Sequence, residues 1–208
     1  MTETPLLSAQ DHQRQLIQHF AATLPDLRDL GYGDHTARRL LKQFTPTPLA
    51  PDQHRRIPPP QTATDLVTLV PSGEVARTYW PAGAYLRDLT LRGQVRLRSA
   101  YLATDTDGRI PAVYPITARY RIGSAAALRH IPTAAAAAAV AHPETAILWP
   151  GQAWYYELGD GVPLDLDLGY ARTGTGGAGA LAGVQHHHLT DLQALASAGG
   201  VLKGRRSV

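Results

Sequence analysis

The sequence of 208 residues contains no cysteine, one methionine and two phenylalanines. The absence of cysteine excludes disulfide scaffolds, thiolate zinc sites, iron–sulfur clusters and cysteine nucleophiles. No apolar run reaches the roughly 18 to 20 residues that a membrane-spanning helix needs. The first ten residues include Glu3 and no basic residue, unlike the start of a signal peptide. We therefore expect a soluble protein that is not exported.

Lysine is also scarce, so arginine supplies 18 of the 20 basic residues, against 17 acidic ones. The formal net charge is only +3, but residues 61–130 hold nine basic and five acidic side chains. A planar guanidinium is well suited to contacts with phosphate or carboxylate. The alternative explanation is a GC-rich genome, which favours arginine and alanine codons without any functional meaning.

The N-terminal part of the chain has a helical pattern. Apolar residues follow Ser8 at three- and four-residue steps, and Asp34 can cap a second helix over residues 35–44. Residues 45–64 contain six prolines, which fix φ and lack an N–H group, so we expect an extended linker outside any packed sheet. Residues 1–64 are thus predicted to form a helical arm with a proline-rich linker. Its basic residues are Arg38, Arg39, Lys42, Arg55 and Arg56.

From residue 65 onward the hydrophobic period changes to two, and turn residues recur at intervals of roughly ten. The tip at residues 105–108 contains the Asp-Gly pair of a tight hairpin turn, and Pro111 and Pro115 predict a bulge or an edge position in the strand that follows. Strands are predicted over residues 65–70, 74–80, 85–91, 94–104, 109–122, 145–149, 153–158 and 162–170. Short helices are predicted over residues 124–129 and 133–141.

These elements predict a mainly β fold, an antiparallel sandwich or jelly roll of about eight strands over residues 65–172, with a closed barrel as the structural alternative. The helical N-terminal arm is a small appendage of this body. Residues 173–208 are predicted to form a glycine-rich loop, a short helix that begins near Thr190, and a basic tail.

The strongest functional pattern is a set of arginines on two neighbouring strands. Leucine, valine and isoleucine alternate along residues 86–98 and 116–122, which leaves the arginines on the other side of each strand. If the Asp-Gly turn joins the two strands, the arginines share one outward sheet face. Such a face can bind a nucleic-acid backbone, an acidic partner subunit or anionic lipid, and the alternative is a solvated face. Its members are Arg92, Arg96, Arg98, Arg119 and Arg121.

Three adjacent histidines at positions 186–188 are the most conspicuous polar cluster. In a strand only His186 and His188 can share a metal ion, and a third ligand is required. No pattern in the sequence places such a ligand, so we expect no metal site, no other cofactor and no catalytic site. A cupin-like metal-dependent enzyme is the alternative, but residues 65–129, where its first histidines would lie, contain no histidine.

In residues 75–93 an apolar strand and a proline-containing turn lead into a strand of alternating leucine and arginine. This arrangement resembles the early strands of jelly-roll capsid proteins of icosahedral, often membrane-containing bacteriophages, over residues 65–122. The resemblance implies a non-enzymatic virion structural protein, assembled in the host cytoplasm as a homo-oligomer. Its partners would be copies of itself and other virion proteins, together with nucleic acid or an anionic membrane surface.

The resemblance also assigns roles to parts of the chain. Residues 1–64 would be the exchange or anchoring element, the arginine face a contact between subunits or with the interior, and residues 174–189 a loop that is ordered only in the assembly. The alternative function is a nucleic-acid-binding module that uses the arginines of the sheet and the basic residues of the arm.

Overall fold

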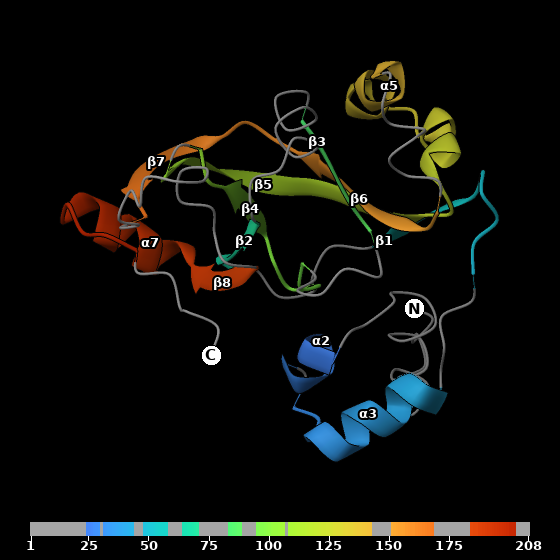
Figure 1. Ribbon diagram of the computed structural model, residues 1–208, viewed down its shortest axis with the longest axis horizontal. Coiled ribbons are helices and arrows are strands. Elements are labelled where there is room, and N and C mark those ends of the chain that lie inside the picture. Colours follow the sequence, from blue (N-terminus) through green and yellow to red (C-terminus); the bar gives the residue numbers. More distant parts are fainter. Residues whose placement is uncertain are drawn as a thin grey trace, which may run out of the picture. The chain divides into compact units, whose positions relative to one another are not determined.

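The computed structural model describes residues 24–29, 31–43, 48–57, 64–70, 83–88, 95–106, 108–142, 151–168 and 184–202. The chain divides into two compact units, Met1–Leu49 and Ala50–Val208. Over the described ranges, the second unit contains eight strands in one mixed, open sheet and a few short helices (Figure 1). The predicted mainly β fold with about eight strands is confirmed.

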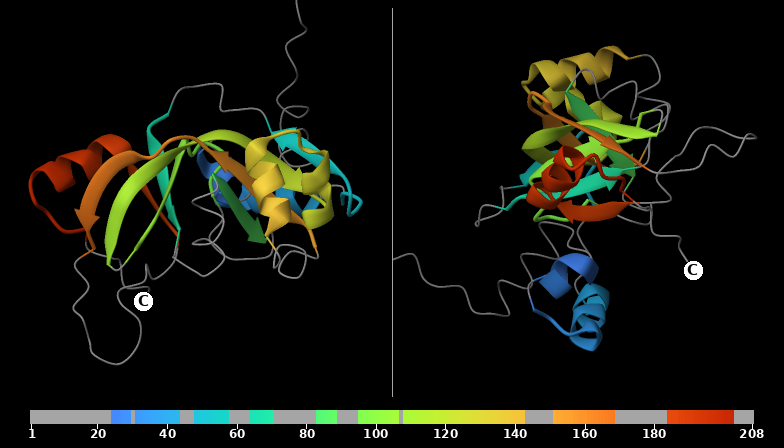
Figure 2. Two further views of the ribbon diagram at one scale, coloured as in Figure 1. Left: turned by 90° about the horizontal axis from the view of Figure 1, so that it is seen from above. Right: turned by 90° about the vertical axis from the view of Figure 1, so that its left-hand side faces the viewer.

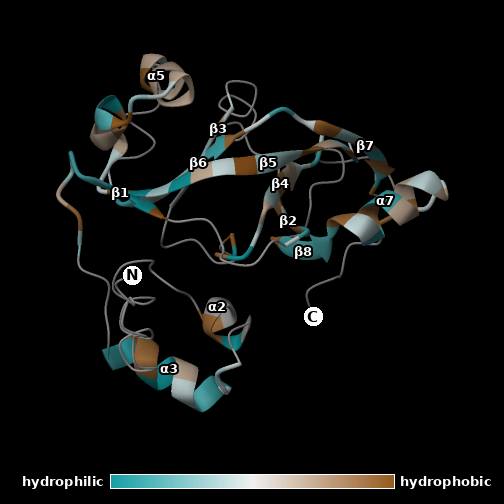
Figure 3. Ribbon diagram, turned by 180° about the vertical axis from the view of Figure 1, so that it is seen from behind, coloured by the Kyte–Doolittle hydropathy of each residue, from teal (hydrophilic) through white to brown (hydrophobic). Residues whose placement is uncertain are grey.

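The N-terminal unit contains helices α2 (Leu24–Asp29) and α3 (Asp34–Gln43). Asp34 lies in the first turn of α3, where a carboxylate is favoured, and also pairs with Arg28 of α2. Ala37 and Leu40 are buried, and hydrophilic and hydrophobic residues alternate around the helix (Figure 3). The helix predicted over residues 35–44 is confirmed to within one residue at each end, whereas most of the segment after Ser8 lies outside the described residues.

Strand β5 (Arg109–Ile122) is the centre of the β body and has the predicted bounds. Its second half pairs with β6 (Ala153–Leu158) and its first half with β7 (Val162–Asp167), both antiparallel. The backbone N–H of Gly159 donates to the carbonyl of Pro115 at 2.9 Å between these two pairings. Strands β6 and β7 therefore follow the same side of β5, and together the three form one long curved ribbon (Figure 2).

The register of this ribbon is interrupted at two points. The pairing with β7 shifts between Ile110 and Ala112, at Pro111, and the pairing with β6 shifts between Ile116 and Ala118. A proline cannot donate to the ladder, so the irregularity that the sequence predicted in the first half of β5 is confirmed at Pro111. The hairpin turn before β5 is confirmed as well: Thr106 and Arg109 exchange two backbone hydrogen bonds at 2.7 and 3.0 Å, and Gly108 has a φ of +80°.

Five further strands complete the sheet. Strands β1 (His54–Ile57) and β3 (Ala84–Asp88) give an antiparallel group in the order β1-β5-β6-β3. Strand β4 (Tyr101–Thr104) pairs with the first half of β5, and β2 (Leu66–Val70) lies between β4 and β8 (Gln185–His188). Strands β2 and β4 are parallel, so the prediction of a purely antiparallel sheet is wrong. The thirty residues that connect them are long enough for the crossover that a parallel pair requires.

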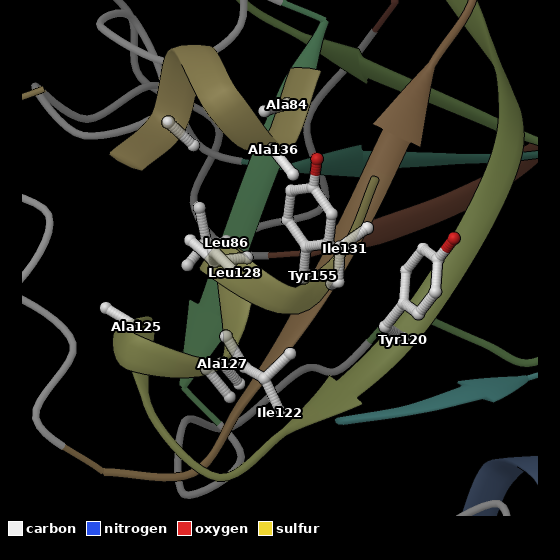
Figure 4. Packing of buried hydrophobic residues seen from close by; sticks show 12 residues of the cluster. Ala84, Leu86, Tyr120, Ile122, Ala125, Ala127, Leu128, Ile131, Ala136 and Tyr155 are labelled. Carbon is white, nitrogen blue, oxygen red and sulfur yellow. The ribbon is translucent and has the colours of Figure 1, made fainter. Parts of the chain in front are cut away.

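Two hydrophobic clusters lie at opposite ends of the curved ribbon (Figure 2). At one end, the 3-10 helix η2 (Ala125–His130) and α5 (Ala134–Ala141) cover β5, β6 and β3. Leu128 and Ile131 of this layer lie against Leu86 and Tyr155 of the sheet (Figure 4). At the other end, α7 (Leu189–Ser197) packs on β7, β2 and β4.

The helices of the β body form close to where the sequence predicts them. The hydroxyl of Thr133 accepts from the N–H of Ala136 at 3.2 Å and caps α5, and Ser124 caps η2 in the same way at 3.1 Å. The predicted C-terminal helix near Thr190 is confirmed and begins one residue earlier. Among the helices of the described ranges, none combines the length and apolar character that crossing a lipid bilayer requires.

Three local predictions are wrong. The proline-rich segment contributes β1, because the four residues His54–Ile57 contain no proline and pair with β5. In the strand predicted over residues 94–104, Tyr101–Thr104 is a strand, but residues 95–100 form a turn in which the N–H of Ser99 donates to the carbonyl of Arg96 at 3.0 Å. The histidine run, predicted to be part of a loop, forms β8 against β2. The predicted strands over 74–80 and 145–149 and the glycine-rich loop at 174–183 lie outside the described residues.

Candidate functional site

The arginines predicted to form one exposed sheet face are not all exposed. Arg119 and Arg121 are each only 4% exposed, so the prediction that they face solvent is wrong. Arg96 is half-buried, Arg98 is exposed, and Arg92 lies outside the described residues. The alternation along β5 correctly separates two faces, but both faces of its second half are covered. Alternation indicates which residues share a face and does not indicate whether that face meets water.

The registers of β1, β5, β6 and β3 place these arginines beside aromatic side chains. Arg55, Arg121 and Trp154 are directly opposite one another in one row, and Arg119, Tyr156 and Tyr85 lie in the next. Residues that are paired in this way project from the same face of a sheet. We call these six residues the arginine–aromatic face. The opposite face of the same strands carries the cluster under η2 and α5.

The aromatic part of this face is closely packed. Tyr85, Trp154 and Tyr156 are 2 to 4% exposed. The ring of Tyr156 lies 5.9 Å from that of Tyr85 and 6.1 Å from that of Trp154, centre to centre. These distances are typical of favourable aromatic pairs. The face therefore surrounds its arginines with a medium of low polarity, in which charge interactions are stronger than in water.

Arg119 has a structural role on this face. Its Nη1 donates to the carbonyl of Leu97, and its Nη2 donates to the carbonyl of Ser99 at 2.6 Å. Both acceptors belong to the turn that precedes β4. The guanidinium thus fastens this turn to the sheet and satisfies carbonyl groups that the turn leaves without strand partners.

Arg121 is just as deeply buried but has fewer partners. Its Nη2 donates to the amide oxygen of Gln152 at 2.6 Å, whereas Nε and Nη1 have no hydrogen-bond partner among the residues that the structure describes. Burial lowers the pKa of Arg121, and the charge of Arg55 across the strand pair lowers it further. The side chain therefore remains a buried cation with donors that are not used.

A buried hydrogen-bonded chain connects the histidine run to the same turn. The hydroxyl groups of Ser99 and Thr68 are 2.6 Å apart, and that of Thr68 lies 3.0 Å from Nδ1 of His186. Ser99 and Thr68 are both completely buried. Burial lowers the pKa of His186 to about 4, with contributions from the charges of Arg96 and His187. His186 is therefore neutral at physiological pH and links β8 to β2.

His188, the other candidate metal ligand, interacts with Asp65. His188 is exposed, its Nδ1 lies 2.6 Å from a carboxylate oxygen of Asp65, and this contact raises its pKa. His186 and His188 thus interact with different partners on or next to β2. Among the described residues, no group of three or more histidine, aspartate or glutamate side chains is arranged to hold a metal ion.

The shifted pKa values of His186 and His188 predict that stability depends on pH. Because the pKa of His186 in the folded protein is about 4, below its ordinary 6.5, the unfolded chain binds the proton first as the pH falls. We expect the free energy of unfolding to fall between about pH 6.5 and pH 4 in the wild type, and to fall less in His186→Asn. Urea titrations at several pH values measure this difference.

The matched control is His188→Asn. The raised pKa of His188 stabilises the folded protein at low pH, so removing it is expected to make the acid sensitivity steeper. Identical pH profiles for the wild type and His186→Asn would show that the pKa of His186 is not lowered in the folded protein.

A second buried polar cluster was not anticipated from the sequence. The carboxylate of Glu157, 8% exposed, accepts hydrogen bonds from the hydroxyl groups of Thr133 and, at 3.3 Å, Tyr155. The ring of Tyr120 stacks on that of Tyr155 at 5.7 Å, and burial and the nearby Glu157 raise the pKa of both tyrosines. The cluster ties the first turn of α5 to the sheet. The available signal was the single charged residue in the otherwise apolar segment Ala153–Leu158.

The basic residues predicted for the arm lie in different units. Arg38, Arg39 and Lys42 are exposed on α3, whereas Arg55 and Arg56 belong to β1 of the β body. Arg56 is exposed and Arg55 is half-buried.

Comparisons with protein-family models, with curated proteins and with solved structures find no match. The candidate site of this chain is therefore defined by its own geometry, as a buried arginine–aromatic face.

Proposed function

We propose that the protein is a non-enzymatic structural subunit that acts by symmetric self-assembly, as in a virion capsid, and that its β body is of the jelly-roll type. The observation that carries the proposal is the division of the chain into a small helical unit and a separate β body. A body with a tethered arm is the organisation in which one subunit exchanges an element with the next.

The open edges of the sheet support the same proposal. Over the described part of the chain, β1, β3, β7 and β8 each pair with only one neighbouring strand, and the end of β7 is also bridged to Val201. An open edge presents backbone N–H and C=O groups that a strand of another copy can satisfy. Arginines and flanking prolines protect β1 from such pairing. We therefore expect copies to associate through β3 or β8.

The proposal predicts that the molar mass in solution depends on protein concentration. Light scattering coupled to size-exclusion chromatography of the full chain is expected to give a multiple of the 22.4 kDa chain mass, increasing with loading concentration. The measurement is repeated at low and high salt, because contacts between charged surfaces weaken as salt rises. A mass of one chain at every concentration and salt level would contradict self-assembly.

The exposed face of α3 favours a second candidate, a nucleic-acid-binding function. Arg38, Arg39 and Lys42 are exposed together, while the acidic Asp34 of the same helix is neutralised by Arg28. Phosphate contacts by such residues give an affinity for arbitrary DNA that falls steeply with salt. DNA binding by a chain that stays monomeric would favour this candidate, and assembly in the absence of DNA favours the first.

A further inference from the structure

We propose that His186 and His188 form one half of a site for a transition metal ion of the zinc class, and that the same two residues of a second copy complete it. The inference is carried by the positions of the two imidazoles on β8, by the atoms that hold each ring, and by the edge of β8 that pairs with no other described strand. It rests on the self-assembly proposed above only in that the second pair of ligands comes from another copy.

The first argument is the spacing of the two histidines. In the pairing of β8 with β2, His186 and His188 project from the same face of the sheet. Residues two apart in a strand have Cα atoms about 7 Å from each other, which is close enough for both imidazoles to reach one ion. The histidine between them, His187, projects from the opposite face, and its Nε2 lies 3.1 Å from the amide oxygen of Gln185.

The second argument is the orientation of the rings, because each is held through Nδ1. This atom of His186 lies 3.0 Å from the hydroxyl of Thr68, and that of His188 lies 2.6 Å from a carboxylate oxygen of Asp65. Among the described residues, Nε2 of neither ring has a hydrogen-bond partner, and Nε2 of His186 is not fully buried. A metal-bound histidine usually donates its other ring N–H to a carboxylate, a carbonyl group or water. The contact of His188 with Asp65 has this form and leaves Nε2 to bind the ion.

The donor atoms determine the class of ion. Imidazole nitrogen binds zinc, copper, nickel and iron, whereas calcium and magnesium require oxygen ligands. The lowered pKa of His186 keeps its ring neutral at physiological pH, which is the form that binds a metal ion. The charged groups that act on the two rings are two carboxylates and two guanidinium groups, those of Asp65, Asp191, Arg96 and Arg98. Because these charges balance, the site selects an ion by its affinity for imidazole.

The third argument is that two histidines do not complete a metal site. A structural zinc ion takes four ligands in a tetrahedral arrangement, and no group of three suitable side chains is arranged to hold an ion within the described ranges. From the sequence we expected no metal site, because a third ligand was lacking. In a two-fold assembly both copies present the same surface to each other. A two-fold axis through the ion, next to the open edge of β8, therefore supplies the two further histidines.

The test is a titration with zinc chloride of the full chain, prepared without a polyhistidine tag and stripped of metal with EDTA. Bound zinc is measured by competition with a chromophoric chelator, and molar mass is measured by light scattering at low protein concentration. We expect one zinc ion per two chains and a doubling of the molar mass relative to the protein in EDTA. His186→Asn and His188→Asn are each expected to abolish both effects. Asp65→Asn is expected to weaken zinc binding by about 10- to 100-fold, the usual effect of removing the partner of a metal-bound histidine.

His187→Asn is the matched control, because His187 is on the same strand but projects from the opposite face. This variant is expected to keep both zinc binding and the increase in mass. The inference is overturned if the wild type binds no more zinc than His188→Asn, if one zinc ion binds per chain without a change in mass, or if His187→Asn loses binding equally. If His186→Asn does not fold, the exposed His188 decides the question through His188→Asn.

Measurements in EDTA separate this inference from the proposed function. Assembly that occurs in EDTA and does not respond to zinc contradicts the shared metal site and leaves the proposed function standing. A chain that is monomeric in EDTA and dimeric with zinc supports the shared site and contradicts assembly through the protein surfaces alone.

Discussion

Replacing Arg119 with methionine is expected to lower the free energy of unfolding by about 3 kcal/mol, since two hydrogen bonds from a charged donor are lost. The carbonyls of Leu97 and Ser99 then remain next to an apolar side chain without the donors that now satisfy them. The turn before β4 is released from the sheet, and the buried chain from Ser99 through Thr68 to His186 is weakened with it. Urea unfolding followed by tryptophan fluorescence measures the loss.

The same substitution at Arg121 provides the matched comparison. The two arginines lie on one strand and one face and are equally buried, but within the described ranges Arg121 makes one hydrogen bond and its Nε and Nη1 have no acceptor. Arg121→Met is expected to change the free energy of unfolding by no more than about 1 kcal/mol, because the lost bond is offset by removal of a buried charge that has no ion-pair partner among the described residues. If Arg119→Met and Arg121→Met lower the free energy of unfolding equally, the two arginines do not differ in their contribution to stability.

Among the glycines that the structure describes, Gly123 is expected to be the one at which alanine is most disruptive. A Cβ atom at this position would lie 1.8 Å from the carbonyl oxygen of Ala50, which belongs to the backbone just before β1. The N–H of Gly123 also donates to the carbonyl of Gln53 at 2.9 Å, and Ser124 donates to that of Pro51 at 2.8 Å. Since backbone cannot move aside as a side chain does, we expect a loss of about 3 kcal/mol.

The control for this variant is Gly151→Ala, because a Cβ atom at Gly151 meets no atom within 4 Å. It is expected to leave the unfolding midpoint almost unchanged. Hydrogen exchange of the β1 amides reports directly on the docking of this strand, and Gly123→Ala is expected to increase it. An unchanged midpoint and unchanged exchange in Gly123→Ala would show that residues 50–57 do not pack against β5.

The elements that local sequence determines were predicted well. Strand β5 and the hairpin turn before it follow from two-residue alternation and an Asp-Gly pair, and α5 follows from Thr133 and six alanines. Two-residue alternation also holds along β7, where Leu164 and Leu166 are buried while Asp165 and Asp167 are exposed. In each case the residues that carry the sequence pattern are in, or directly next to, the element that they predict.

The features that depend on distant partners were not predictable in the same way. Residues 54–57 lie in a segment whose prolines are typical of an extended linker. They form β1 because they pair with a free edge of β5. The histidines of β8 join the sheet through β2, more than a hundred residues earlier in the chain. The burial of Arg119 and Arg121 requires cover on the polar side of β5, which the pattern of β5 itself cannot reveal. The alternation therefore grouped Arg119 and Arg121 on one face correctly, but it predicted an outward face, whereas both side chains are buried.

The central functional claim is that copies of this chain assemble symmetrically through the β body and the helical arm. Electron microscopy of the purified full chain, at the concentrations where light scattering is performed, tests this most directly. We expect regular particles or closed rings with repeating subunits. Fields of separate single molecules at every concentration would contradict it.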